Sequence, residues 1–133
     1  MLRTLLVVDD NQSVRESLRF LLSRRGFHVL VAQDGPEAVR LAGEHQIDGA
    51  MVDVNMPGMN GIAVCRSLRD SASATGRSIA VWLMSGTRTP DILHQGREAG
   101  ALDLLCKPFD LALLYRHFDQ AFAGAAPGDR PGK

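Results

Sequence analysis

Five short, mainly apolar runs recur along the chain without sustained alternation of apolar and polar positions. They span residues 5–8, 29–32, 49–52, 79–84 and 102–105. Runs of this length, rich in valine and leucine, are typical of strands covered on both faces, as in a parallel sheet. The stretches between the runs are long enough for helices. The pattern therefore predicts an α/β domain: a doubly wound five-stranded parallel sheet with helices on both faces.

The helices differ in how clearly the sequence marks them. Asn11 is a candidate N-cap of the first helix, and Gly26 is a candidate stop. Residues 110–123 read as a last helix, because their large apolar side chains repeat at the helical period. The helix expected over residues 90–99 is weaker, since Gly96 inside it costs ~1 kcal/mol relative to alanine.

The end of the chain differs in composition from the rest. Residues 124–133 are rich in glycine and proline and show no apolar period, so we predict a disordered tail. Residues 1–123 then form a single domain, which we expect to be a stand-alone module; the alternative is that the tail is the start of a linker in a longer chain.

Composition and charge narrow the class of protein. The chain has 133 residues, 45% of them hydrophobic and 23% charged, with a formal net charge of zero. This balance excludes a disordered chain and argues against binding to nucleic acid or an anionic membrane by bulk electrostatics. No apolar run approaches the ~20 residues of a membrane span, and the first 30 residues lack signal-peptide features. The two cysteines form no disulfide framework and no CxxC pair in the sequence, which fits a reducing cytoplasm. We expect a cytoplasmic monomer, since no apolar stripe is left over once the core is assigned.

Polar residues follow four of the predicted strands at the point where each strand ends. A carboxylate after a strand is often only a helix cap, Ser-Gly is usually a turn, and Lys-Pro is usually a surface corner. Their joint occurrence is harder to explain in this way, because the carboxyl ends of parallel strands meet at one edge of the sheet, where ligands bind. The residues are Asp9 and Asp10, then Asp53, then Ser85 and Gly86, then Lys107 and Pro108.

These residue types favour one kind of chemistry. Three carboxylates brought close together must either retain a proton or bind a cation. With oxygen ligands only, the cation should be hard: Mg²⁺, or Mn²⁺ as an alternative. Ser85, the N–H of Gly86 and the ammonium of Lys107 are donors suited to phosphoryl oxygens. Together they describe phosphoryl transfer to an aspartate.

At this point the chain resembles a known family, the receiver domains of two-component response regulators, over residues 3–123. The combination of motifs is specific, and it implies a flavodoxin-like receiver fold. The matching stretches are Val7-Val8-Asp9-Asp10-Asn11, Val52-Asp53-Val54-Asn55-Met56-Pro57-Gly58-Met59-Asn60-Gly61, Met84-Ser85-Gly86 and Cys106-Lys107-Pro108-Phe109.

The resemblance implies a Mg²⁺-dependent phosphoacceptor site. Asp53 would take a phosphoryl group from a phosphohistidine on a histidine kinase or a histidine phosphotransfer protein. Asp10 and Asp53 would bind Mg²⁺ directly, Asp9 through water, and Asn55 through its backbone carbonyl.

The resemblance also implies how the phosphoryl group is held and sensed. Ser85 and Lys107 would each bond a phosphoryl oxygen, and the Lys107–Pro108 peptide bond is typically cis in the family. Asn55 and Thr87 flank the site and would tune the access of water. Phosphorylation would draw Ser85 and the loop after it toward the phosphate.

One position departs from the family pattern. The family usually carries an aromatic residue on the fifth strand that turns inward when the serine or threonine moves. The corresponding residue here is Leu104. The usual readout is therefore not expected, and either another route reaches the active face or the protein relays phosphate with little switching.

The leading interpretation is a signalling switch that acts through an unknown downstream protein and catalyses only its own phosphorylation and dephosphorylation. An aspartate-nucleophile phosphatase of the haloacid dehalogenase type needs a second carboxylate two residues after the nucleophile. Asn55 follows Asp53 at that spacing, and Gln12 follows Asp10. Neither residue is a carboxylate, so this class of phosphatase is disfavoured. A dinucleotide-binding domain is disfavoured because no GxGxxG follows the first strand. A degenerate scaffold is disfavoured by the complete set of site residues.

Overall fold

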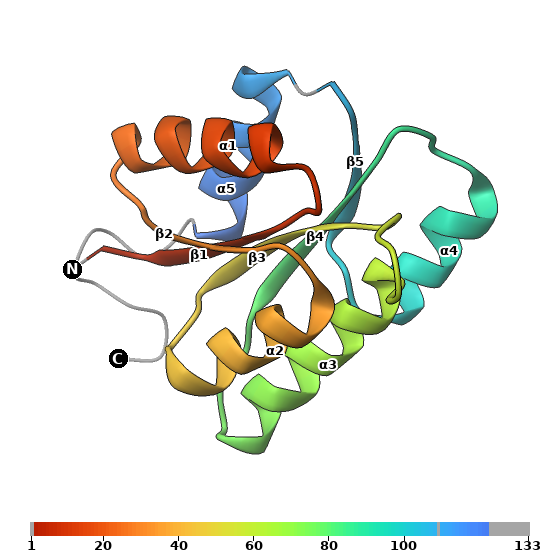
Figure 1. Cartoon of the computed structure of the whole chain (residues 1–133), viewed down its shortest axis with the longest axis horizontal. Coiled ribbons are helices and arrows are strands. Elements are labelled where there is room, and N and C mark those ends of the chain that lie inside the picture. Colours follow the sequence, from red (N-terminus) through yellow and green to blue (C-terminus); the bar gives the residue numbers. More distant parts are fainter. Residues whose placement is uncertain (1, 109, 123–133) are drawn as a thin grey trace.

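A computed structural model describes residues 2–108 and 110–122 of the chain. Its centre is a five-stranded parallel sheet in the order β2-β1-β3-β4-β5 (Figure 1). This confirms the predicted α/β class and the five strands, each within two residues of its expected bounds. The strands are β1 (Thr4–Val8), β2 (His28–Ala32), β3 (Gly49–Asp53), β4 (Ala80–Ser85) and β5 (Asp103–Cys106).

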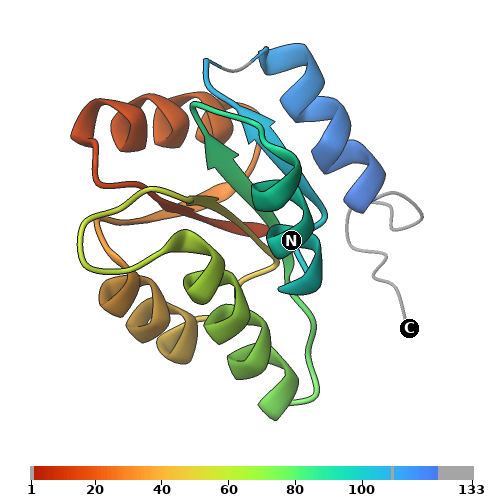
Figure 2. The ribbon, with the colours of Figure 1, turned by 90° about the vertical axis from the view of Figure 1, so that its right-hand side faces the viewer.

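Helices cover both faces of the sheet. Figures 1 and 2 show α1 and α5 on one face and α2, α3 and α4 on the other, which is the doubly wound arrangement. The helices are α1 (Gln12–Arg24), α2 (Gly35–Glu44), α3 (Gly61–Ala74), α4 (Pro90–Glu98) and α5 (Leu111–Ala121).

The core lies in two layers because alternate residues of each buried strand face opposite sides of the sheet. On β1, Leu5 and Val7 pack with the α1 and α5 side, while Leu6 and Val8 pack with the α2, α3 and α4 side. All four are fully buried. This two-sided burial is the reason that the strand reads as an uninterrupted apolar run.

The first helix begins and ends as the sequence predicts. Asn11 caps α1, where its side chain accepts a hydrogen bond from the N–H of Val14 (3.1 Å). After the helix, Gly26 adopts φ 98°, a left-handed conformation that favours glycine.

Gly96 has a packing role that helix propensity alone does not reveal. It is buried inside α4, and a Cβ built on it would lie 2.7 Å from Leu83 Cδ1 on β4. The glycine therefore permits the close approach of α4 to the sheet. Glycine lowers the helix propensity at this position, but a larger residue would not fit against Leu83.

Two further expectations concern the whole chain. Among the described residues, none of the helices has the length and apolar character needed to cross a bilayer. The tail predicted over residues 124–133, and residue 123 at the end of the predicted domain, lie outside the described residues.

Candidate functional site

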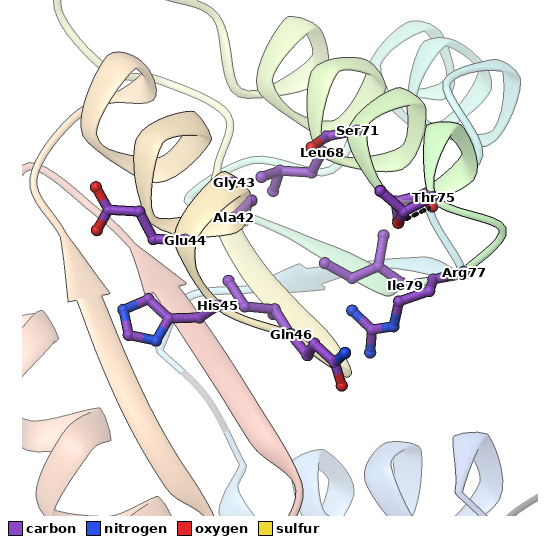
Figure 3. Close-up of a pocket in the computed structure, with 12 residues that line it drawn as sticks. Ala42, Gly43, Glu44, His45, Gln46, Leu68, Ser71, Thr75, Arg77 and Ile79 are labelled. Atoms are coloured by element: carbon purple, nitrogen blue, oxygen red, sulfur yellow. Dashed lines mark hydrogen bonds between the residues drawn. The ribbon is translucent and has the colours of Figure 1, made fainter.

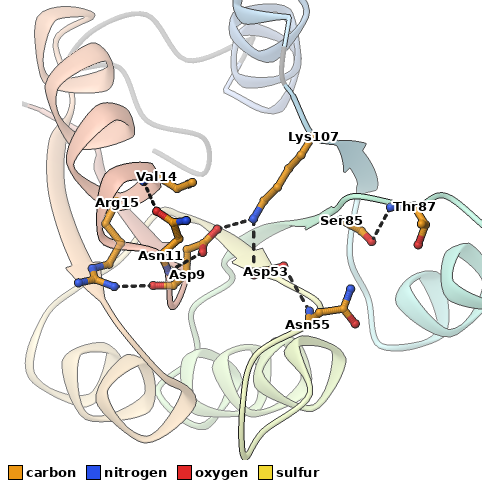
Figure 4. Close-up of polar contacts among 9 residues, drawn as sticks. All are labelled: Asp9, Asn11, Val14, Arg15, Asp53, Asn55, Ser85, Thr87 and Lys107. Carbon is orange, nitrogen blue, oxygen red and sulfur yellow. Dashed lines mark hydrogen bonds and ion pairs between the residues drawn. The ribbon is translucent and has the colours of Figure 1, made fainter.

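The predicted site residues meet at the edge of the sheet where the strands end. Asp9 follows β1, Asp53 ends β3, Ser85 ends β4 and Lys107 follows β5. Figure 4 shows the Lys107 side chain reaching toward Asp9 and Asp53 (Figure 4). The hydrogen bonding between β4 and β5 continues to the carboxyl ends of these strands, because the N–H of Lys107 donates to the carbonyl of Ser85 (2.8 Å). Parallel pairing thus brings together residues that are up to 98 positions apart.

Three carboxylates form the centre of the site. One oxygen from each of Asp9, Asp10 and Asp53 lies within 4.8 Å of the other two. Asp9 is fully buried and Asp53 is 6% exposed, whereas Asp10 is exposed. This set of oxygen donors fits a hard divalent cation reached from the solvent side.

Both carboxylate oxygens of Asp9 are engaged by the protein. Oδ1 accepts a hydrogen bond from the N–H of Asn11 (2.9 Å), and Oδ2 accepts one from Lys107 Nζ (2.7 Å). The Asp9 carbonyl also accepts from Arg15 Nη1 of α1 (2.9 Å). Sequence reasoning missed Arg15, because nothing in the spacing alone shows that its side chain turns back to the end of β1.

Asp53 is held less completely. Its Oδ1 accepts a hydrogen bond from the N–H of Asn55 (3.2 Å), and its Oδ2 lies 3.5 Å from Lys107 Nζ. Burial raises the pKa of the Asp53 carboxyl, and the charge of Asp9 raises it further, against the opposing effects of Lys107 and the Asn55 N–H. Burial and Asp9 therefore disfavour the ionised form of Asp53, and an added positive charge would stabilise that form.

Lys107 is the cation shared by the two buried carboxylates. Burial lowers the pKa of its ammonium, but the hydrogen bond and charge of Asp9, followed by the charge of Asp53, outweigh burial and raise the pKa overall. Lys107 therefore stays charged, and it lies closer to Asp9 than to Asp53. The ammonium thus contacts two of the three clustered carboxylates and fully neutralises neither of them.

The residues predicted to donate hydrogen bonds to a phosphoryl group, Ser85 and Gly86, lie at the end of β4 and directly after it. Ser85 is fully buried, and its Oγ accepts a hydrogen bond from the N–H of Thr87 (3.1 Å). Its hydroxyl proton remains available to another acceptor. Gly86 is exposed, and no heavy atom outside its chain neighbours lies within 4 Å of a Cβ built on it.

Three features flank the site: one directly after β5, one on β5 and one at the start of α3. The Lys107–Pro108 peptide bond is cis. Leu104 is fully enclosed, with 1% of its surface exposed, and belongs to the core on the α2, α3 and α4 side. Gly61 packs directly on the backbone of the phosphoacceptor candidate: a Cβ there would lie 2.0 Å from the Asp53 carbonyl oxygen. Sequence reasoning placed Gly61 in a motif without assigning it this contact.

A separate hollow of about 300 Å³ lies at the opposite end of the sheet (Figure 3). Its walls come from the last turns of α2 and α3 and from the segments that precede β3 and β4, and they include His45, Gln46, Thr75 and Arg77. The Thr75 hydroxyl donates to the carbonyl of Ala72 (3.0 Å). Because the strands are parallel, this hollow is a strand length away from the carboxylate cluster and is a different surface.

Comparisons with known proteins agree on one family. The family profile described as response regulator receiver domain matches residues 5–119. Response regulator MprA of Mycobacterium sp. (strain KMS) is 38% identical over 127 residues, covering 96% of this chain and 54% of that protein. Response regulator MprA of Mycobacterium leprae (strain TN) is 36% identical over 125 residues, covering 94% of this chain and 53% of that protein. The chain thus spans about half the length of these curated relatives.

Solved structures share the fold over most of the chain. Chemotaxis protein CheY4 of Vibrio cholerae superposes with a TM-score of 0.84 at 27% identity, covering 91% of this chain and 99% of that chain. A response regulator protein from Burkholderia pseudomallei with a phosphorylated aspartic acid gives 0.77 at 26%, covering 85% and 64%. The CheX–CheY–BeF3–Mg²⁺ complex of Borrelia burgdorferi gives 0.81 at 25%, covering 91% and 90%.

Proposed function

This chain belongs to the family of response regulator receiver domains, the receivers of two-component signalling, and on that premise we propose that Asp53 is its phosphoacceptor. The observation that carries the proposal is the setting of Asp53: a buried carboxylate at the end of β3, clustered with Asp9 and Asp10 and 3.5 Å from Lys107 Nζ. Such a carboxylate is a nucleophile with charge-stabilising groups already in place.

The reaction is a transfer from a phosphohistidine on a histidine kinase or a histidine phosphotransfer protein. An oxygen of the Asp53 carboxylate attacks phosphorus and forms a P–O bond. The P–N bond to the imidazole breaks, and the histidine leaves with the electron pair and takes up a proton. The ionised carboxylate is the reacting form, and burial and Asp9 disfavour it by raising the pKa of Asp53.

The carboxylate cluster is proposed to hold Mg²⁺, with Mn²⁺ as an alternative of similar ligand preference. Bound Mg²⁺ supplies positive charge against the carboxylates and the phosphoryl oxygens. Asp10, Asp53 and the backbone carbonyl of Asn55 are the proposed direct ligands. Asp9 is assigned a contact through water, because its carboxylate oxygens accept shorter hydrogen bonds (2.9 and 2.7 Å) than the contacts of 3.2 and 3.5 Å made by those of Asp53.

The remaining residues hold the transferred group. Lys107 moves part of its interaction from Asp9 to a phosphoryl oxygen, and Ser85 donates its free hydroxyl proton to another. The N–H of Gly86, an exposed residue, is a further donor. Asn55 and Thr87, which bracket the site through hydrogen bonds to Asp53 and Ser85, set how readily water reaches the phosphoaspartate.

Two of the similar structures support this chemistry by analogy. One describes a phosphorylated aspartic acid in a response regulator from Burkholderia pseudomallei, and the other a BeF3–Mg²⁺ complex of CheY from Borrelia burgdorferi. For the present chain we propose a signalling switch in a cytoplasmic pathway, acting as a monomer through a downstream protein. Its chemistry is limited to its own phosphorylation and dephosphorylation.

Intact-mass analysis after incubation with acetyl phosphate tests the proposal. We expect one added phosphoryl group in the presence of Mg²⁺, none with EDTA, and none in Asp53→Asn. Asp70→Asn, which removes an exposed carboxylate from α3, is the matched control and should still be modified. Modification of Asp53→Asn to the wild-type extent, or no modification of the folded wild-type protein, would contradict the proposal.

A further inference from the structure

Arg88 ties the loop after Ser85 to strand β5. The residue lies in the loop between β4 and α4, three positions beyond Ser85. Its Nη1 donates a hydrogen bond to the carbonyl oxygen of Leu104, and its Nη2 lies 3.4 Å from Asp103 Oδ1. One guanidinium therefore contacts two successive residues of β5.

Asp103 is itself fixed, so it is a firm partner for the guanidinium. Its Oδ1 accepts a hydrogen bond from the N–H of Leu104 (2.7 Å), and its Oδ2 lies 4.0 Å from Nε2 of His117 on α5. The Asp103 side chain is 28% exposed, whereas that of Arg88 is 43% exposed. The contact is thus partly screened by solvent, but its acceptors belong to a strand that is paired with β4.

The position of this contact gives it a bearing on the phosphoryl-binding loop. Thr87, directly before Arg88, donates its N–H to Ser85 Oγ. The loop is therefore held at one end through Ser85 and at the other through Arg88, and Gly86 lies between them. A guanidinium–carbonyl hydrogen bond needs good distance and alignment, so a displacement of the loop away from β5 breaks it.

We propose that Arg88 is a positioning residue that holds the loop after Ser85 in its unphosphorylated place through the Leu104 carbonyl and Asp103. The inference rests on the proposed function of Asp53, because the loop must approach the phosphoryl group for the contact to matter. A contact present only in the resting arrangement stabilises that arrangement and opposes the other. Leu104 has no aromatic ring to couple the loop to β5. The contact between the loop and β5 instead runs from the Arg88 side chain to the backbone carbonyl of Leu104.

The first test measures the affinity for beryllofluoride, a phosphoryl analogue, at saturating Mg²⁺. Arg88→Met should bind beryllofluoride about fivefold more tightly than wild type, the effect of losing a contact of about 1 kcal/mol. The affinity for Mg²⁺ alone should stay within about twofold, which separates positioning of the loop from damage to the site. Arg88→Lys keeps a charge opposite Asp103 and should give a smaller gain.

The second test needs no phosphoryl analogue. Hydrogen exchange of the Thr87 N–H, which donates to Ser85 Oγ, should be about fivefold faster in unliganded Arg88→Met than in wild type. It should also be faster in Asp103→Asn, which should remain folded because the amide oxygen can still accept the Leu104 N–H. Arg97→Met, which removes an exposed arginine from α4, is the matched control and should match wild type in both tests.

The outcomes separate this inference from the proposed function. If wild type fails to bind beryllofluoride, the function assigned to Asp53 is wrong, and the exchange result alone decides whether Arg88 positions the loop. If wild type binds it, an unchanged or weaker affinity in Arg88→Met overturns the inference. Unchanged exchange in both variants also overturns it.

Discussion

At the scale of single residues, the site is defined by a shortage of positive charge. Lys107 is shared between Asp9 and Asp53, and the shorter contact goes to Asp9, 2.7 Å against 3.5 Å. Asp53 is therefore a buried carboxylate with an incomplete set of partners. The same shortage of partners that suits Asp53 to the proposed cation and phosphoryl group makes its burial unfavourable for folding.

Replacing Asp53 should consequently stabilise the metal-free protein in a pH-dependent way. Burial and Asp9 raise the pKa of Asp53 above its ordinary value of 3.8, so the folded state binds this proton more tightly than the unfolded state does. Wild type loses stability relative to Asp53→Asn as the pH rises from 3.8 through the raised pKa. We expect Asp53→Asn to melt about 3 °C higher near neutral pH, with the difference gone below about pH 3.5.

Thermal denaturation in EDTA at several pH values measures this difference. Asp70→Asn, an exposed position on α3, should melt within about 1 °C of wild type throughout. A melting temperature of Asp53→Asn that is equal to or below that of wild type near neutral pH would show that Lys107 fully compensates Asp53.

At the scale of elements, local signals in the sequence predicted the strands and the helix ends but not the close approaches between them. The apolar run of β1 reflects burial on both faces, and Asn11 and Gly26 act within a few residues of their own positions. Gly61 and Gly96 are different, because their contacts are with Asp53 and Leu83, which belong to strands and not to the glycines' own helices. From the sequence alone, where the packing partner is unknown, a glycine in a helix indicates only a loss of helix propensity.

Replacing a tightly packed helical glycine and an exposed one by alanine should change the free energy of unfolding in opposite directions. In Gly61→Ala the new methyl would meet backbone atoms of Asp53 and Val54 at 2.0–2.8 Å, so we expect the free energy of unfolding to fall by about 2–3 kcal/mol. Gly43 on α2 is exposed and has no heavy atom within 4 Å of a built Cβ. Gly43→Ala should raise the free energy of unfolding by about 0.5 kcal/mol.

Urea denaturation of the two variants beside wild type tests the pair. Because the clash in Gly61→Ala is with the Asp53 carbonyl, this variant should also accept phosphate more slowly, whereas Gly43→Ala should match wild type. A neutral or stabilising effect of Gly61→Ala would mean that the start of α3 can move away from β3.

At the scale of the whole molecule, the topology explains why the candidate site could be predicted. Parallel pairing places every strand end at one edge, so Asp9, Asp53, Ser85 and Lys107 could be assigned to one place from strand assignment alone. The division of Lys107 between two carboxylates could not be predicted. Neither could the contact of Arg88 with β5, because both depend on side-chain conformations that tertiary packing selects.

The carboxylate cluster also joins distant parts of the fold, which gives metal binding a measurable effect on the whole molecule. Asp9 and Asp10 follow β1, and Asp53 ends β3, so their oxygens converge only in the folded chain. A cation held by them binds the folded state and not the unfolded one. At ten times its dissociation constant, Mg²⁺ should raise the free energy of unfolding by about 1.4 kcal/mol, which corresponds to a rise of about 4 °C in melting temperature.

The increment on adding Mg²⁺, rather than the absolute melting temperature, is the quantity to compare, because removing a carboxylate also relieves repulsion in the metal-free protein. Asp10→Asn should lose most of the increment, since Asp10 is the exposed member of the cluster and the one best placed to meet a hydrated cation. Asp70→Asn should keep the full increment, and EDTA should reverse it in every variant. An equal increment in Asp10→Asn and wild type would place the stabilising cation elsewhere on the protein, and the ligands proposed for Mg²⁺ would then have to be reassigned.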